Sequence, residues 1–254
     1  MYVDTSKVVL RKIDKKTAKK MIVENHYSRK FSLCRHAIGI FYQEDTEHRF
    51  FEGEKEEKLI GCLTYGHPVG RSVVGSLFKE EIIDYESVLE LTRLFIHDGY
   101  GKNIESYSIG LSFKWLKKHD ENIKVLISYA DPDRLHLGGI YKATNWIYQG
   151  AGLNLMPNYS VSLVEEPYDW IHSRTVFARF GSHNIDKLKS AIGHTFWRRR
   201  EPEKHRYIYF LGSKSENKRF KKFMKYESKD YPTNADEYLP PIEEIEVNKG
   251  ITNE

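Results

Sequence analysis

Hydrophobic and polar positions between Glu86 and Gly150 follow two different periods. A nearly continuous apolar run over Val88–Ile96 is typical of a strand buried on both faces. After a turn with two glycines, apolar residues at three- and four-residue spacing predict a helix that ends near His119. Ile123–Tyr129 reads as a second strand, and helical spacing over Leu137–Tyr148 predicts a second helix. Because a helix joins the two strands, we expect them to be parallel, in a βαβα unit.

Further elements are expected on both sides of this unit. Strands are predicted at Val8–Ile13, Leu33–Tyr42, Leu59–Tyr65 and Arg206–Leu211, helices at Asp14–Asn25, Ile185–Ile192 and Ser215–Tyr226, short strands or loops at Ala151–Pro157 and Tyr159–Glu166, and a β-rich segment at Ser173–Phe180. Residues 43–58 are expected to form a hairpin loop or a small insertion. The pattern predicts an α/β fold with a mixed central sheet flanked by helices, in a single domain over residues 1–225.

Composition excludes several classes of protein. Charged residues make up 30% of the 254 residues and apolar ones 40%, which is typical of a soluble globular chain. No run of about 18 apolar residues occurs, and the N-terminal stretch lacks the apolar core of a signal peptide. Cys34 and Cys62 are far apart and form no CxxC motif. We therefore expect no membrane partner, no disulfide framework and a location in the cytoplasm.

Charge is distributed unevenly along the chain. Residues 226–254 contain two lysines and eight acids, and this acidic, proline-containing tail is expected to be disordered. Residues 187–225 contain thirteen lysines or arginines against three acids. Such a basic segment, with Trp197 beside three arginines, favours a nucleic acid partner. A solvated surface is the alternative on charge alone.

The turn between the first strand and helix of the central unit is a candidate phosphate site. Gly99 and Gly101 can adopt positive φ, and Asn103 or Ser106 can cap the helix that follows. Backbone N–H groups at such a helix N-terminus bind phosphate or pyrophosphate well. An ordinary turn is the alternative, because a glycine turn at this position is often no more than a turn.

Five other residues are candidates for catalysis, and each also has a purely structural interpretation. His26 and Tyr27 lie at a helix C-terminus, where a histidine often serves as a cap. Arg93 interrupts an apolar strand, where it can bind an anion or form an ion pair with Asp131. Asp131 follows a central strand, where ligands meet open sheets, but it also precedes Pro132 as an Asx-turn residue does. Tyr141 lies on the apolar face of its helix and can be a packing residue.

Several passages, in their order along the chain, resemble the Mom family of phage DNA-modification proteins, whose fold is similar to that of the GNAT N-acetyltransferases. They are Asn25-His26-Tyr27-Ser28, Glu90-Leu91-Thr92-Arg93-Leu94 with Asn103-Ile104-Glu105-Ser106, Ser128-Tyr129-Ala130-Asp131-Pro132 with the segment His136–Trp146, and Lys204–Leu211. The resemblance covers roughly residues 8–212. It implies a GNAT-like fold and conversion of adenine in double-stranded DNA to N6-(methylcarbamoyl)adenine, which protects phage DNA from host restriction.

The resemblance also implies roles for particular residues. His26, Tyr27, Arg93, Asp131 and Tyr141 correspond to active-site residues of the family, and Tyr65 is a weaker match. An acyl-CoA-type donor is expected at the turn that holds Gly99, Gly101, Asn103 and Ser106. The family's association with iron raises a possible ligand set of His26, Asp131 or Asp133, and His136.

Three other functions stay open at the level of sequence. An ordinary N-acetyltransferase would act on a small amine or a protein. An amino-acid:DNA transferase would act on a modified thymine. A non-catalytic DNA-binding protein could use the same scaffold without chemistry, and none of the motifs separates these alternatives.

Overall fold

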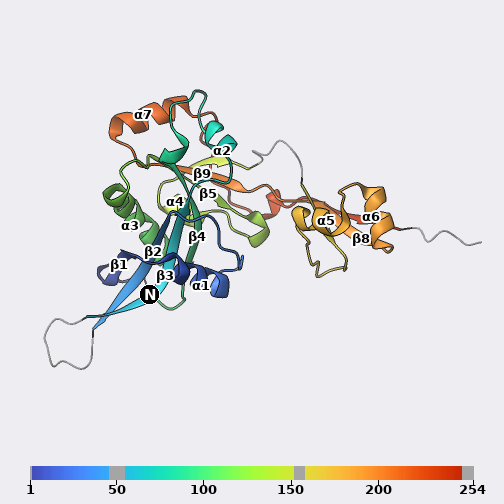
Figure 1. The fold of residues 1–254 in the computed structure, drawn as a ribbon, viewed down its shortest axis with the longest axis horizontal. Helices are drawn as coiled ribbons and strands as arrows, with labels where there is room; N and C mark the ends of the chain where they lie inside the picture. The colour runs from blue at the N-terminus through green and yellow to red at the C-terminus, as the bar shows by residue number, and fades with distance from the viewer. Residues whose placement is uncertain (1, 46–54, 152–157, 248–254) are drawn as a thin grey trace, which may run out of the picture. The chain divides into compact units, whose positions relative to one another are not determined.

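The computed structural model describes residues 2–45, 55–151 and 158–247 (Figure 1). These residues form two compact units rather than the single domain expected from the sequence. Unit 1 comprises Met1–Ala130, Gly138–Gly150 and Arg206–Tyr231, and unit 2 comprises Asp131–Leu137, Ala151–His205 and Pro232–Glu254. Each unit is assembled from three separate segments and has its own apolar core.

Unit 1 contains the mixed central sheet predicted from the sequence, and this sheet has seven strands. Its strands are β1 (Val8–Lys12), β2 (His36–Asp45), β3 (Lys55–Gly66), β4 (Val88–Ile96), β5 (Val125–Ala130), β6 (Ile147–Gly150) and β9 (His205–Phe210). They lie in the order β1-β2-β3-β4-β5-β9-β6. Strands β1 to β4 pair antiparallel in succession, whereas β4 and β5 are parallel, as the βαβ pattern predicted. The tip of the β2–β3 hairpin, within the predicted insertion, lies outside the described residues.

The two parallel strands pair along only part of their length. Val88, Leu89 and Glu90 of β4 pair with Val125, Leu126 and Ile127 of β5, and the pairing ends there although both strands continue. From Leu91 onward β4 therefore runs beside β5 without ladder hydrogen bonds between them. We call this place the β4–β5 split. Backbone groups of β4 beyond Glu90 are therefore not used in pairing with β5.

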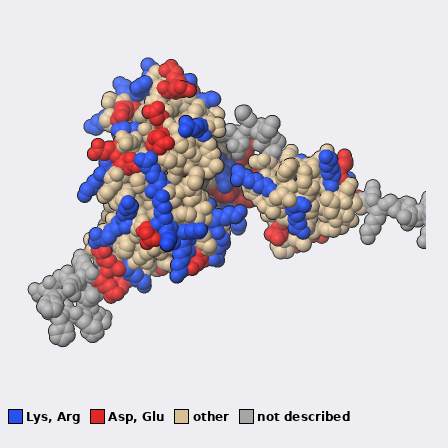
Figure 2. All heavy atoms as spheres, viewed as in Figure 1, with Lys and Arg blue, Asp and Glu red and all other residues tan. Residues whose placement is uncertain are grey.

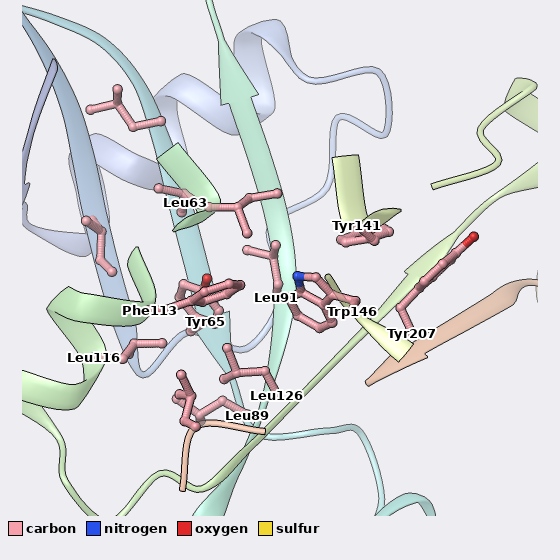
Figure 3. Packing of buried hydrophobic residues seen from close by; sticks show 14 of the residues in the cluster. Leu63, Tyr65, Leu89, Leu91, Phe113, Leu116, Leu126, Tyr141, Trp146 and Tyr207 are labelled. Carbon is pink, nitrogen blue, oxygen red and sulfur yellow. The ribbon is translucent and has the colours of Figure 1, made fainter. Parts of the chain in front are cut away.

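Helices cover both faces of the sheet. One face packs against α3 (Ile104–His119) and α4 (Gly139–Ala143), with Leu63, Leu89, Phe113 and Trp146 among the buried residues (Figure 3). The other face packs against α2 (Arg71–Gly75) and α7 (Lys214–Phe223), and α1 (Lys15–Asn25) covers its β2–β4 part through Ala18 and Ile22. The sheet is thus the middle layer of three.

The second predicted helix of the central unit is shorter than expected. Helix α4 ends at Ala143, and Ile147–Gly150 is strand β6, so the prediction of helix up to Tyr148 is wrong. Two residues with left-handed backbone set these limits: Gly138, at φ +74°, precedes the helix, and Asn145, at φ +59°, follows it. A side chain at position 138 would also overlap the Tyr207 ring. The apolar spacing continues past the helix because Trp146 and Tyr148 are buried too.

Unit 2 is a small three-stranded sheet with two helices. Strands β7 (Tyr159–Ser162), β8 (Phe196–Arg200) and β10 (Ile242–Ile245) lie in the order β10-β8-β7, with α5 (Ser173–Phe180) and α6 (Ile185–Ile192) in the connection from β7 to β8. Val161, Val176, Leu188 and Phe196 form its core. The helix at 185–192 was predicted correctly.

Two sequence predictions for unit 2 are wrong. Ser173–Phe180 is helical rather than β-rich: the His172 side chain accepts a hydrogen bond from the Arg174 N–H at the helix start, and Val176 and Phe180 face the core one turn apart. In the tail, Ile242–Ile245 pairs with β8, so this part of the expected disordered segment is a strand. Glu243 and Glu244 lie opposite Arg198 and Trp197, which gives the acidic tail a basic strand to pair with.

Candidate functional site

Polar side chains gather at the β4–β5 split, within an otherwise apolar core. The Ser128 hydroxyl on β5 donates a hydrogen bond to the Leu91 carbonyl of β4 at 2.9 Å. The same hydroxyl lies 2.7 Å from the Tyr141 hydroxyl of α4. Because Ser128 has only one proton to donate, Tyr141 is the donor in this second bond. Ser128 therefore joins α4 to β4 at the point where the strands separate.

Tyr141 is a hydrogen-bond donor that stays neutral. Its side chain is buried, and burial raises the pKa of the Tyr141 phenol to about 12, against an opposing effect of the Ser128 hydrogen bond. Tyr27 and Glu90 act on it electrostatically and raise the pKa further, which places both near the phenol. At neutral pH Tyr141 can therefore donate a hydrogen bond but cannot serve as a base.

The segment that follows α1 carries two of the predicted residues. His26 is the C-cap residue of α1, and its backbone N–H donates to the Ile22 carbonyl at 2.9 Å. Its Nδ1 accepts the Ser28 N–H at 3.1 Å, which leaves Nε2 to carry the proton in the neutral ring. The neighbouring Tyr27 ring lies 4.2 Å away between centroids and is half exposed.

Arg93 fixes this segment to the sheet. Its Nε donates to the Lys30 carbonyl at 3.0 Å and its Nη1 to the Thr92 carbonyl at 2.5 Å. Two of its guanidinium nitrogens are therefore bonded to backbone oxygens of its own unit. This role explains why a charged residue interrupts an apolar strand: Arg93 holds residues 26–30 against β4.

Asp131 belongs to unit 2 and takes part in its local structure. One carboxylate oxygen accepts the Asp133 N–H at 3.1 Å, the Asx-turn considered from the sequence. The other lies 3.6 Å from the Lys204 ammonium. Of the five predicted catalytic residues, His26, Tyr27, Arg93 and Tyr141 therefore belong to unit 1 and Asp131 to unit 2.

The turn before α3 has the backbone conformation that the sequence predicted. Gly99 and Gly101 take φ values of +101° and +98°, and the N-cap Asn103 is left-handed, with no hydrogen bond from its side chain to the helix. The Ser106 hydroxyl donates to the Asn103 carbonyl. Space around Gly99 is open, whereas a side chain at Gly101 would meet the Val3 nitrogen at 2.7 Å. Tyr2 and Val3 thus line one side of the turn.

Sequence reasoning missed the residue that joins these elements. Ser128 lies inside one of the motifs without a predicted role, although a serine within the apolar strand Ile123–Tyr129 is the kind of interruption that drew attention to Arg93. Tyr65, the weaker match, is fully buried on β3 and bonded to Ser112 at 2.6 Å. Burial raises the pKa of Tyr65, so it too is a neutral hydroxyl in the core.

The predicted iron ligands do not assemble. Throughout residues 2–45, 55–151 and 158–247, no three histidine, cysteine, aspartate or glutamate side chains group closely enough to hold a metal ion. His26 Nδ1 already accepts from Ser28, and Asp131 is engaged with Asp133 and Lys204. These donors do not fit a two-histidine, one-carboxylate site.

In the described part of the chain, no helix is both long and apolar enough to span a bilayer.

Comparisons with known proteins agree with the resemblance seen in the motifs. The model of the Mom protein family matches residues 7–233. A relative from Escherichia phage Mu, "Methylcarbamoylase mom", is 24% identical over 204 residues, which cover 78% of this chain and 73% of the relative.

Solved structures similar to this chain include several N-acetyltransferases. NAA60 from Arabidopsis thaliana in complex with acetyl-CoA is 10% identical with a TM-score of 0.41, over 80% of this chain and 99% of the other. The spermidine/spermine N-acetyltransferase SpeG from Vibrio cholerae is 12% identical with a TM-score of 0.41, over 83% and 98%.

Proposed function

Because the chain belongs to the Mom protein family, we propose that it is a phage transferase that converts adenine in double-stranded DNA to N6-(methylcarbamoyl)adenine and so protects the DNA from host restriction. The match over residues 7–233 carries the proposal, since it includes the whole central sheet of unit 1. The polar groups at the β4–β5 split support it, because they give a buried core a place for chemistry.

The donor would bind along the split. An acyl-CoA-type molecule would supply an activated carbonyl carbon, and its phosphates would meet the turn that holds Gly99, Gly101, Asn103 and Ser106. The uncapped first-turn N–H groups of α3 suit an anion there. Beyond Glu90, β4 has no ladder bonds to β5, so its backbone is available to an extended, amide-containing arm.

The adenine would have to leave the duplex to be modified. In a base pair N6 is occupied, and extruding one nucleotide costs roughly a few kcal/mol. Tyr27 is suited to stack on the extruded base because its ring is half exposed and is held beside His26. Arg93 would act on the base only indirectly, as the residue that positions this segment through the Lys30 carbonyl.

The transfer step needs a proton acceptor and a donor to oxygen. As the N6–carbon bond forms and the bond from the carbonyl carbon to its leaving group breaks, N6 loses one proton, for which Asp131 is our candidate acceptor. Negative charge develops on the carbonyl oxygen, and Tyr141, kept protonated by burial, would turn its one hydroxyl proton from Ser128 to this oxygen and donate a hydrogen bond to it. Glu90 and Tyr27, which raise the Tyr141 pKa, would keep this phenol from ionising.

Mass spectrometry of nucleosides tests this proposal. Plasmid DNA from cells that express the protein should contain a deoxyadenosine heavier by one methylcarbamoyl group, and DNA from cells with an empty vector should not. Unmodified deoxyadenosine in cells that contain folded protein would refute the proposal. Turnover of acetyl-CoA with free amines but without DNA would favour an ordinary N-acetyltransferase, and a modified thymine would favour an amino-acid:DNA transferase.

A further inference from the structure

Helix α1 presents four lysines on one side and its apolar residues on the other. Lys15, Lys16, Lys19 and Lys20 are exposed, whereas Ala18 and Ile22 are fully buried against the sheet. Positions i, i+1, i+4 and i+5 of a helix lie on a common face. The four ammonium groups therefore form one continuous cationic strip.

No salt bridge compensates the strip within the described part of the chain. None of the four lysines forms an ion pair with a described residue, and the neighbouring Asp14 caps the helix by accepting the Thr17 N–H at 2.9 Å. Lys15 with Lys19, and Lys16 with Lys20, are like charges one turn apart, and each pair disfavours the helix. A cationic face that disfavours its own helix suits a polyanionic partner.

The strip leads toward the candidate site. The same unit continues from α1 into the segment with Tyr27 and Lys30, both exposed, and Arg93 holds the Lys30 carbonyl at β4. In Figure 2, lysine and arginine side chains gather on the face of unit 1 where Figure 1 shows α1. A duplex lying along this face would place its bases beside the half-exposed Tyr27.

Four arginines of the segment that is most basic in the sequence are less available to a partner. Arg199 is 2.6 Å from Asp133, Arg198 is 3.8 Å from Glu243, and Arg200 pairs with Glu203. Arg206 is buried, only 3% exposed, and lies over the Tyr226 ring. These four charges are used inside the protein, whereas the lysines of α7 in the same segment are exposed and form the competing cationic surface.

We propose that the exposed face of α1, with Lys15, Lys16, Lys19 and Lys20, and the adjoining Lys30 form the surface that binds the sugar-phosphate backbone of the target duplex. The proposal rests on the proposed function, because it identifies where that enzyme meets its DNA. It concerns the phosphates only, so binding here carries no sequence preference of its own.

Two variants with equal charge change test this surface. In one, Lys15, Lys16, Lys19 and Lys20 are all changed to Gln, which keeps a good helix former at each position. In the other, four exposed lysines of α7 in the same unit, Lys214, Lys218, Lys221 and Lys222, are changed to Gln. Binding of a fluorescent duplex of about 20 base pairs is measured by anisotropy over a series of salt concentrations, and circular dichroism verifies that both variants are folded.

The α1 variant should bind at least tenfold more weakly at low salt, with a log–log salt slope shallower by roughly 0.9 for each phosphate that the protein no longer neutralises. The α7 variant should stay within about threefold of the unchanged protein. Equal losses of affinity in both variants, or a larger loss in the α7 variant, would overturn the proposal.

Nucleoside mass spectrometry on the same variants separates this inference from the proposed function. If the unchanged protein binds DNA through α1 but yields no modified adenine, the proposed function fails and the docking surface stands. If adenine is modified normally by the α1 variant and its DNA binding is unchanged, the docking surface fails and the proposed function stands.

Discussion

The two units hold their candidate catalytic groups by different kinds of interaction. At the β4–β5 split of unit 1, Tyr141, Ser128 and the Leu91 carbonyl form a chain of neutral hydrogen bonds, and Arg93 binds backbone oxygens. In unit 2, Asp131 pairs with Lys204. Buried neutral hydrogen bonds do not respond to salt, whereas a partly exposed ion pair is screened by it. Unit 1 is therefore built to keep a fixed geometry, and Asp131 keeps a charge that can change during a reaction.

The largest effect is expected from removing that charge. Asp131→Asn keeps the oxygen that accepts the Asp133 N–H, so the Asx-turn should persist and Tm should change by less than about 2 °C, because an exposed ion pair contributes only about 0–1 kcal/mol. An amide cannot accept the N6 proton, and the fraction of modified adenine should fall about 100-fold or more. Near-normal modification by this variant would mean that Asp131 only forms the turn.

Loss of Arg93 should come next. Arg93→Ala frees the Lys30 carbonyl and lets the segment with Tyr27 shift, and displacements of about 1 Å can cost on the order of 100-fold in rate. We expect a 10- to 100-fold loss of modified adenine with little change in the pH profile, since Arg93 positions other groups and takes no part in proton transfer. Arg93→Lys keeps the charge but not the fork, so little rescue is expected. Full rescue by Lys would show that charge alone matters.

A smaller loss should follow removal of one hydroxyl. Tyr141→Phe keeps the ring packed against Trp146 and Tyr207 but removes the bond to Ser128, at a cost of about 1 kcal/mol in the free energy of unfolding. Modification should fall about tenfold if the phenol donates to the developing oxygen. Tyr209→Phe, at a half-buried tyrosine of β9 stacked on Phe113, is the matched control. Equal activity of the two variants would remove Tyr141 from the chemistry.

The smallest effect concerns pH and histidines outside the site. Burial lowers the pKa of His36 in unit 1 and of His205 in unit 2 below the ordinary histidine value. A lowered pKa in the folded state means that the unfolded chain binds more protons, so stability is complete above about pH 6.5 and falls as the pH drops below it. Thermal unfolding at pH 7 and pH 5 measures this loss, which His36→Gln and His205→Gln should each reduce. A Tm unchanged between these pH values would contradict it.

Much of unit 1 was predictable because its elements are set by local pattern. Val88–Ile96 and the helix end at His119 were predicted at the residues where the structure has them, since a long apolar run and a regular helical period leave little choice. The end of α4 was not, because Asn145 reverses the backbone while apolar residues continue in the same spacing. Apolar spacing indicates which residues are buried. A buried strand that directly follows a helix therefore continues this spacing beyond the end of the helix.

The division into two units and the strand in the tail could not be predicted from local pattern, because both depend on contacts between residues far apart in the sequence. Nothing local shows that Ile242–Ile245 pairs with Phe196–Arg200, because that pairing joins an acidic and a basic segment that lie more than forty residues apart. The candidate site was predictable by residue type, through the motifs, but not by role. That Arg93 binds the Lys30 carbonyl rather than Asp131 follows from how the 26–30 segment folds back onto β4.

The contact between Gly101 and residues 2–3 has a practical consequence for the design of variants. The Val3 N–H donates to the Lys102 carbonyl at 3.1 Å, so Tyr2 and Val3 run alongside the bend that leads into α3. A substitution at either residue would alter the surroundings of any molecule held at that bend. Assays of donor affinity should therefore use protein in which Tyr2 and Val3 are unchanged.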